Sequence, residues 1–307
     1  MNIIYLGTPD FAVLPLKKIY EEGKHNIIAV ITNKDKPVGR KQILTSPPVK
    51  VYANEVGIPV YQYDKIRVEG VNDLKKLNPD IMITCAFGQI LSQEILDIPK
   101  YGVINIHASL LPAYRGASPI HFAILNGEKT TGISVMRTDI GIDTGDVLLQ
   151  RELTIKPDET CGELFDRLSF LGAECIIEAL DLITNGKAVF VKQDESKASG
   201  SKIIKKEMAK IDWSNSAEVI YNQIRAFNPV PVAFCTFKEQ LFKIYNAEVV
   251  DYSGEQGKIV FVDKNKLVIA CGKGALSLLR VQKSGGNQMN ISDFLRGNKL
   301  TVGEDFI

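Results

Sequence analysis

Apolar residues in the first two-thirds of the chain form short continuous runs that alternate with segments of helical spacing. The runs are rich in Ile and Val and cover residues 2–6, 26–32, 81–86 and 103–107. Continuous runs of this length are typical of parallel strands buried on both faces. Helices are expected between the runs, at residues 11–22, 47–56, 73–77 and 119–126. This alternation predicts a doubly wound, mainly parallel sheet of the Rossmann-like α/β type.

The alternation ends after residue 126. Residues 132–138 and 147–153 are expected to form an antiparallel pair of strands, and a long helix is expected over 160–185. Thr160 is its expected N-cap, with Glu163 three residues later in the position of a capping box.

A polar segment with few apolar residues, 191–208, follows and is predicted to be a basic linker. Beyond it, a helix is expected at 214–227, and then come five short β runs. These runs cover residues 232–237, 241–250, 258–262, 266–271 and 276–282. Short strands separated by turns predict a small β-barrel, with an OB-like barrel the leading candidate. The predicted domains are therefore 1–190 and 209–307.

Composition limits the classes of protein that fit this pattern. The chain has 307 residues, 45% of them hydrophobic, and a formal net charge of +1. It is not polybasic overall, and no apolar run approaches the ~20 residues that a membrane span needs. The five Cys lack paired metal spacing, and the N-terminus lacks the charged leader of a signal peptide. We expect a cytoplasmic, monomeric protein that binds no metal and no membrane.

The most informative polar residues lie within the run at 103–107 and in a loop at 141–146. Side chains alternate along a strand, so Asn105 and His107 should project from the same face, about 7 Å apart at their backbones. Asp143 lies in the glycine-flanked loop Gly-Ile-Asp-Thr-Gly-Asp. Asn105 could hold a carbonyl oxygen, and His107 could stabilise an oxyanion or move a proton. Asp143 could orient and charge the imidazole, or accept a proton from an attacking amine.

An Asn-x-His pair at a strand end can equally be a hydrogen-bonded turn without a catalytic role. Two observations favour catalysis: the chain has only three His, and ligands bind at the carboxyl ends of strands in open α/β sheets. A nicotinamide cofactor is not expected. The turn at 6–11 has only Gly7 of the Gly-x-Gly-x-x-Gly pattern, and Pro9 removes an amide donor.

With these residues identified, the chain resembles the folate-dependent formyltransferases over nearly its whole length. Beyond Asn105, His107 and Asp143, the resemblance is carried by Gly-Thr-Pro-Asp-Phe at 7–11, Pro-Pro-Val-Lys at 47–50, Ala-Phe-Gly-Gln at 86–89, His-Ala-Ser-Leu-Leu-Pro-Ala-Tyr-Arg-Gly at 107–116, Asp-Thr-Gly-Asp at 143–146, Ile-Asp-Trp at 211–213 and Arg-Ala-Phe-Asn-Pro at 225–229. Together, Asn105, His107 and Asp143 (the trio) mark these enzymes broadly. The C-terminal motifs narrow the resemblance to the branch that acts on aminoacylated initiator tRNA.

The resemblance implies 10-formyltetrahydrofolate as the donor and initiator methionyl-tRNA, through the α-amine of its methionine, as the acceptor. It implies that Asn105 and His107 hold the developing oxyanion, while Asp143 assists removal of the amine proton. The implied folate contacts are Ser109, Leu110, Leu111 and Pro112, with Phe87, Gly88 and Gln89 as a further wall. Relatives commonly carry Tyr in place of Phe87 and a basic residue in place of Ala113, so the contacts of those groups are not carried over.

A basic loop at 33–46 corresponds to the loop that enters the tRNA acceptor stem in this family. Arg40 matches the key position, where a guanidinium can bind phosphate bidentately or stack on a base. The other implied tRNA contacts are Lys34, Lys36, Lys41, Lys205 and Lys206. By composition alone, the loop would be a solvated loop and the linker a charged spacer.

Two other functions stay open beside this one. A formyltransferase acting on an amino-sugar nucleotide would share the trio, but it has no need of a long basic loop. A nucleic-acid-binding module would use the barrel and leave the trio inert. A glycinamide-ribonucleotide formyltransferase is disfavoured, because that family is typically a single domain without the last ~100 residues.

Overall fold

The computed structural model describes residues 1–39 and 41–307, and their packing divides the chain into two units. Unit 1 contains Met1–Pro119, Thr130–Thr154 and Phe165–Ser201. Unit 2 contains Ile120–Lys129, Ile155–Leu164 and Lys202–Ile307. The domain boundaries expected at 190 and 209 stay a prediction, and the packing boundary in that region lies between Ser201 and Lys202.

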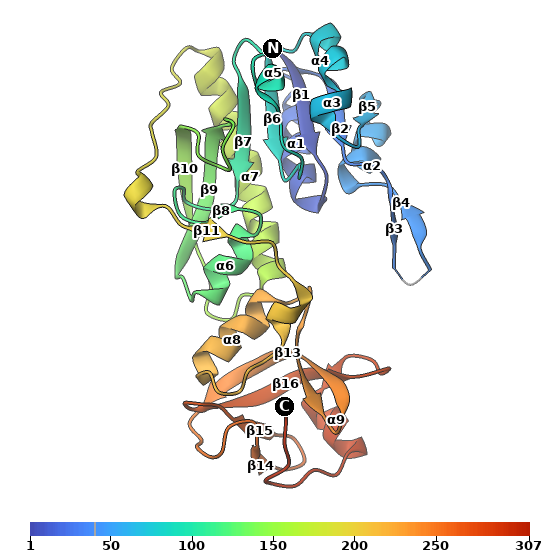
Figure 1. Ribbon diagram of the computed structural model, residues 1–307, viewed down its shortest axis with the longest axis vertical. Coiled ribbons are helices and arrows are strands. Elements are labelled where there is room, and N and C mark those ends of the chain that lie inside the picture. Colours follow the sequence, from blue (N-terminus) through green and yellow to red (C-terminus); the bar gives the residue numbers. More distant parts are fainter. Residues whose placement is uncertain (40) are drawn as a thin grey trace. The chain divides into compact units, whose positions relative to one another are not determined.

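Unit 1 is built on a seven-stranded sheet with the order β10-β9-β7-β6-β1-β2-β5 (Figure 1). Its strands are β1 Asn2–Gly7, β2 Asn26–Thr32, β5 Val60–Gln62, β6 Ile81–Cys85, β7 Val103–His107, β9 Thr130–Arg137 and β10 Val147–Thr154. Strands β5, β2, β1, β6 and β7 are parallel, whereas β9 runs antiparallel to both β7 and β10. The predicted doubly wound, mainly parallel sheet is confirmed.

The order of the strands locates the expected ligand edge. From β1 the chain first adds β2 and β5 on one side, and then β6 and β7 on the other. The order therefore reverses between β1 and β6, and ligands of open α/β sheets bind beyond the carboxyl ends of strands near such a point. Strand β7, which carries Asn105 and His107, lies next to β6 and ends at this edge.

Helices cover both faces of the sheet. They are α1 Val13–Glu22, α2 Pro48–Glu55, α3 Ile66–Glu69, α4 Val71–Leu77, α5 Gln93–Leu96 and α7 Cys161–Thr184. On one face, Ile4 and Met82 pack in a core with Ile66 of α3 and Ile95 of α5. On the other face lies α7, because a Cβ added at Gly172 would meet Ile106 of β7 at 3.1 Å. Since side chains alternate, Asn105 and His107 lie on the face opposite to α7.

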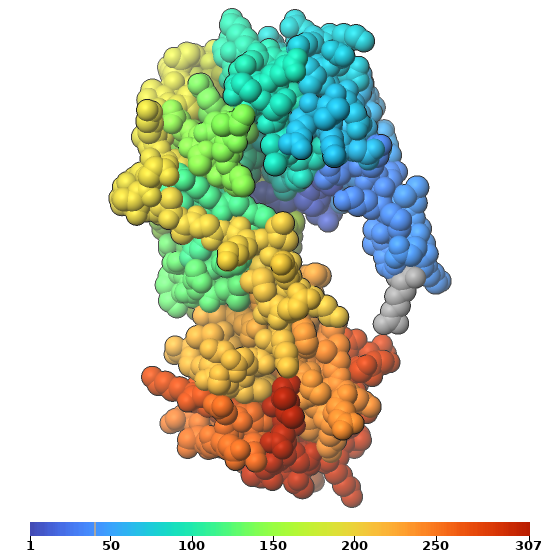
Figure 2. All heavy atoms as spheres, viewed as in Figure 1, coloured from blue at the N-terminus to red at the C-terminus, as the bar shows by residue number. Residues whose placement is uncertain are grey.

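Two pairs of short strands were not expected from the sequence. Strands β3 Lys36–Val38 and β4 Ile43–Thr45 form an antiparallel hairpin within the predicted basic loop. Figure 2 shows this hairpin standing clear of the rest of unit 1. Strand β8 Arg115–Gly116 pairs with β11 Gly200–Ser201, so the C-terminal part of unit 1 is bonded to the loop that follows β7.

Unit 2 contains a six-stranded antiparallel sheet with the order β12-β13-β16-β15-β14 and β17 paired to β16. Its elements are α6 Pro119–Leu125 after its first residue, α8 Ala217–Ala226, β12 Ala233–Phe237, β13 Gln240–Val250, β14 Ile259–Val262, β15 Leu267–Ala270, β16 Ala275–Lys283, β17 Met289–Asn290 and α9 Ile291–Gly297. The five β runs predicted from the sequence correspond to β12–β16.

The last residues of the chain close this sheet into a barrel. Asp305 bridges to Lys258 beside β14, and Phe306 bridges to Phe237 of β12, so the same segment pairs with both edges of the sheet. The bridge to β12 is extended by two hydrogen bonds between the backbones of Thr236 and Ile307. The predicted small barrel is therefore present, and its closure depends on residues that carried no strand pattern.

Candidate active site

The structure brings the predicted amide, imidazole and carboxylate together at the carboxyl edge of the sheet. The Asn105 Nδ2 donates to Asp143 Oδ1 over 3.4 Å, and His107 Nδ1 lies 3.5 Å from Asp143 Oδ2. The imidazole is 6% exposed and the carboxylate 17%, so the cluster reaches the surface of unit 1 on the side of Asp143. We call these three residues the trio.

The backbone of Asp143 explains the glycine-flanked loop. Asp143 has φ 54°, in the left-handed region of backbone conformation that residues other than glycine rarely adopt. Residues held in this region are often found at functional sites. The loop packs tightly on both sides: a Cβ at Gly141 would lie 2.0 Å from the Thr144 hydroxyl, and one at Gly145 would lie 1.9 Å from the Arg137 carbonyl. From this tightly packed loop the carboxylate reaches the backbone of Gly116, whose N–H donates to Oδ2 over 2.8 Å.

Both ring nitrogens of His107 face oxygen atoms. Nε2 lies 3.1 Å from the carbonyl of Tyr114, and Nδ1 faces the carboxylate of Asp143. A carbonyl and an ionised carboxylate can only accept hydrogen bonds, so an N–H on either ring nitrogen has an acceptor in place. These two oxygens fix the orientation of the ring at the trio.

Thr84 sets the direction of the Asn105 amide. It lies on β6 directly beside Asn105 in the strand register, and its hydroxyl donates to Asn105 Oδ1 over 2.9 Å. Because the carbonyl end of the amide is bonded to Thr84, the NH₂ end is turned toward Asp143. The sequence analysis missed this residue. Its only trace in the sequence is a hydroxyl near the end of an apolar strand.

Two family models together match most of the chain. Residues 1–180 match formyl transferase, and residues 203–299 match formyl transferase, C-terminal domain. The chain belongs to the formyl transferase family. The resemblance found from the sequence is confirmed, and the protein is a formyl-transfer enzyme.

Relatives of this formyltransferase share both of its parts. It is 45% identical to the methionyl-tRNA formyltransferase of Ruminiclostridium cellulolyticum, over 99% of each chain. It is also 45% identical to the methionyl-tRNA formyltransferase of Geobacter metallireducens, over 99% of this chain and 97% of that protein. An N-formyltransferase from Helicobacter canadensis, solved with folinic acid and dTDP-3-aminofucose, has a TM-score of 0.69 at 23% identity, covering 92% of this chain and 99% of that chain. This last likeness shows the fold alone.

In this formyltransferase, the turn expected to contact folate follows β7 directly. Ser109 is fully buried, and its hydroxyl donates over 2.6 Å to the carbonyl four residues later. Its own carbonyl accepts from the Ser134 hydroxyl, which in turn accepts from the backbone N–H of Leu111. Ser109 and Leu111 therefore hold the turn in shape. Leu110 and Pro112 are partly exposed and can face a ligand.

The other segment expected to contact folate, residues 87–89, offers a ligand its backbone more than its side chains. The ring of Phe87 is 4% exposed and lies in the core of unit 1, while its carbonyl accepts from Asn33 and Thr8. The Gln89 amide is bonded within unit 1 through both its oxygen and its nitrogen. Gly88, at φ 79°, is exposed and is the residue of this segment whose backbone a ligand could approach.

The predicted tRNA contacts are surface cations in both units. Lys36 and Lys41 are exposed on the β3–β4 hairpin segment, and Lys205 and Lys206 are exposed in unit 2. Lys34 is 48% exposed and pairs with Asp64 over 2.5 Å, a hydrogen bond that raises its pKa. Arg40, the residue at the key family position, lies outside the described residues.

The base of the hairpin is held by one carboxylate. Asp35, just before β3, accepts from the ammonium of Lys50 over 2.8 Å and from the amide of Gln62 over 3.0 Å. The Ser46 hydroxyl, just after β4, donates to the same carboxylate. Hydrogen bonds from Lys50, and then from Gln62, lower the pKa of Asp35 to about 2. The carboxylate therefore stays charged at neutral pH and joins both ends of the hairpin.

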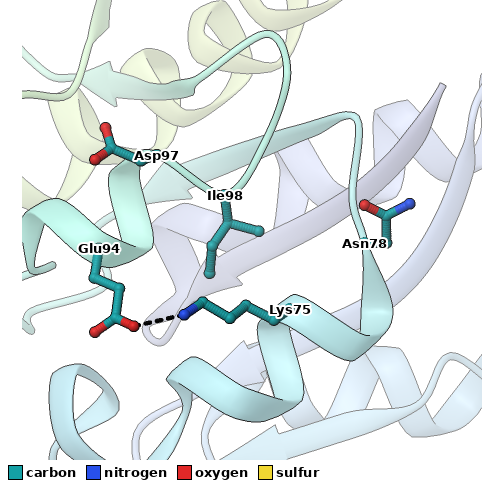
Figure 3. Close-up of a pocket in the computed structure, with 5 residues that line it drawn as sticks. All are labelled: Lys75, Asn78, Glu94, Asp97 and Ile98. Carbon is teal, nitrogen blue, oxygen red and sulfur yellow. Dashed lines mark hydrogen bonds and ion pairs between the residues drawn. The ribbon is translucent and has the colours of Figure 1, made fainter.

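Unit 1 also has a hollow away from the predicted site residues. It has a volume of about 360 Å³ and is lined by Lys75, Asn78, Glu94, Asp97 and Ile98 (Figure 3). Lys75 bonds to Glu94 over 2.6 Å, which leaves no unpaired cation in this lining. Among the described residues, no group of His, Cys, Asp or Glu is arranged to hold a metal, and no helix in the same residues could span a bilayer.

Proposed function

We propose that this formyltransferase moves a formyl group from 10-formyltetrahydrofolate to the α-amine of initiator methionyl-tRNA, with the trio as its catalytic centre. We further propose that it acts in the cytoplasm as a monomer, for the initiation of translation. The observation that carries the proposal is a similarity over the full length of the chain. Two methionyl-tRNA formyltransferases are 45% identical to this chain across both matched domains. The three side chains that this reaction needs lie close together, since those of Asn105 and His107 both contact that of Asp143.

The reaction begins when the neutral amine attacks the formyl carbon. A bond forms between the amine nitrogen and that carbon, and the carbonyl electrons move to the formyl oxygen. Asn105 donates from Nδ2 to this oxygen, and His107 stabilises the negative charge that develops there. Donors directed at a developing oxyanion contribute about 3–4 kcal/mol each in comparable sites.

Asp143 accepts the proton that the attacking nitrogen loses. The tetrahedral intermediate then collapses, the bond between the formyl carbon and N10 breaks, and N10 takes up a proton as tetrahydrofolate leaves. The carboxylate suits this task because it is partly exposed at 17% and accepts a backbone N–H, that of Gly116, at its Oδ2.

The folate ring would bind beside the trio, against the turn that follows β7. The partly exposed Leu110 and Pro112 offer apolar surface, and Gly88 offers open backbone, which suits a flat ring with polar edges. Ser109, Leu111, Phe87 and Gln89 support this wall from behind rather than touching the ring through their buried or bonded groups.

The tRNA would be bound by the hairpin segment and by the lysines of unit 2. We expect Arg40→Ala to raise the KM for tRNA about 10-fold or more and to leave folate binding unchanged, because a guanidinium bonded to phosphate contributes on the order of 1.5–3 kcal/mol. The measurement is steady-state formylation at several salt concentrations. The salt dependence should weaken in the variant, since one phosphate contact is lost. An equal loss of folate and tRNA binding would contradict this division.

A formyltransferase for an amino-sugar nucleotide is the second candidate, because the Helicobacter canadensis enzyme solved with such a sugar shares the fold. One experiment separates the two. The protein is incubated with 10-formyltetrahydrofolate and, in separate reactions, charged initiator tRNA or an amino-sugar nucleotide. Formyl-methionyl-tRNA is the expected product. Formylation of the sugar alone would overturn the proposed acceptor and leave the trio as the centre of a different reaction.

A further inference from the structure

A glutamine from the expected linker contacts the backbone of the Asp143 loop. The Gln193 amide nitrogen donates to the carbonyl of Asp143 and to that of Gly145, each over 2.8 Å. The Gln193 amide oxygen accepts two hydrogen bonds from Arg115, over 3.0 Å from Nε and 2.8 Å from Nη2. One side chain therefore joins the loop of the catalytic carboxylate to the loop that follows β7. All of these residues belong to unit 1.

Chemistry allows only one orientation of this amide. The two backbone carbonyls can only accept, and the guanidinium can only donate, so the NH₂ end must face Asp143 and the oxygen must face Arg115. Arg115 is fixed in turn, because two further N–H groups, one on Nη1 and one on Nη2, form a bidentate pair with Glu195 at 2.9 and 2.7 Å.

The Asp143 loop needs such support. Asp143 holds a left-handed backbone conformation, which persists only where the surroundings over-determine it. The carboxylate also takes its N–H donor from Gly116, the residue after Arg115. Gln193 thus fixes the distance between the two backbone segments that together place Asp143 Oδ2.

We propose that Gln193 is a positioning residue for Asp143, acting on the rate of formyl transfer through that carboxylate. This inference rests on the proposed function, since it requires Asp143 to take part in the reaction. The segment around Gln193 then supports the catalytic centre and is more than a spacer between two domains.

Two substitutions test the proposal. Gln193→Met keeps the length of the side chain and removes every polar bond. Gln193→Glu keeps an oxygen for Arg115 but turns a carboxylate toward two carbonyls. We expect kcat to fall about 10- to 100-fold in both, because a catalytic group displaced by ~1 Å loses up to that factor. KM for tRNA and for the folate should change less than 3-fold. Near-normal kcat in Gln193→Glu would overturn the proposal.

The control lies in the same segment. Ser196 is exposed, and its hydroxyl donates to the neighbouring surface residue Asp194, so Ser196→Ala should leave kcat and KM unchanged. Thermal unfolding of all variants is measured alongside. A loss of kcat in Ser196→Ala equal to that in Gln193→Met would mean that any change in the segment disturbs catalysis, which also overturns the assignment to Gln193.

A double-mutant cycle separates positioning from general damage. In an Asp143→Asn background, whose own rate is set by single-turnover measurement, Gln193→Met should change the rate by less than 2-fold, because the group it positions is already disabled. A further 10-fold loss would show that Gln193 acts by another route. If Asp143→Asn itself retains normal turnover, the proposed role of Asp143 fails, and that outcome is distinct from a failure of Gln193 alone.

Discussion

His107→Ala is expected to lower the kcat for formylation of methionyl-tRNA by about 10³- to 10⁴-fold. The substitution removes the ring that faces Asp143 and that is proposed to stabilise the oxyanion. The fold should survive, because the Tyr114 carbonyl that contacts the ring also accepts from the Ser201 hydroxyl over 3.3 Å. The Ser201 hydroxyl shares its one hydrogen with the Arg115 carbonyl at 3.2 Å, so any loss of stability should stay within about 1–3 kcal/mol, the cost of one unpaired carbonyl. The measurement is single-turnover formylation, with circular dichroism to check the fold.

His25→Ala is the matched control for this variant. His25 precedes β2 at the opposite, amino edge of the sheet, and its ring lies 3.5 Å from the N-terminal amine. The same chemical change there should leave turnover unchanged. If His107→Ala kept near-normal turnover with an intact fold, His107 would have to be removed from the mechanism and the Asn-x-His pair would be a structural turn.

The central part of the site was predictable because it depends on local geometry. Alternation along a strand placed Asn105 and His107 on one face, and the apolar runs placed that strand at a ligand edge. The glycines around Asp143 indicated a tight loop, and the structure gives the reason: each leaves room for an atom that a Cβ would strike. The position of the trio could therefore be predicted from local rules of strand and loop geometry, once the fold class was correct.

The supporting residues were not predictable, because each depends on contacts between distant parts of the chain. Thr84 reaches Asn105 through the register between β6 and β7, which an apolar pattern does not specify. Gln193 reaches Asp143 from 50 residues away and lies in a polar stretch typical of a linker. Glutamine in such a stretch is usually solvated, so only the fold distinguishes this residue from its neighbours.

Burial also changed the role that we assign to several residues predicted to contact folate. Ser109 and Phe87 lie beside positions that can face a ligand, but their own side chains point inward. A sequence motif marks a segment as a unit and does not separate residues that touch a ligand from residues that shape the segment. At Ser109 the hydroxyl bonds to the backbone of its own turn, a common use of serine outside regular elements.

Phe306→Ala is expected to destabilise unit 2 by about 3–5 kcal/mol. The ring is 2% exposed and stacks on Phe237 with centroids 4.3 Å apart, while its edge contact with Phe242 is 5.4 Å. Removing it leaves a cavity at the point where the last residues close the barrel, so the backbone pairing with Phe237 should weaken as well. The chain has one Trp, and Trp213 lies 6.5 Å from Phe306, so its fluorescence reports unfolding of unit 2 in urea.

Phe170→Ala provides the comparison, because Phe170 is 61% exposed on α7 and loses little packing when truncated. Phe306→Leu should cost less than Phe306→Ala, since most of the volume is kept. If Phe306→Ala unfolds at the same urea concentration as Phe170→Ala, the C-terminal segment does not hold the barrel closed. If the Trp213 transition falls at a lower urea concentration than the main far-ultraviolet dichroism transition of the whole chain, the two units unfold separately.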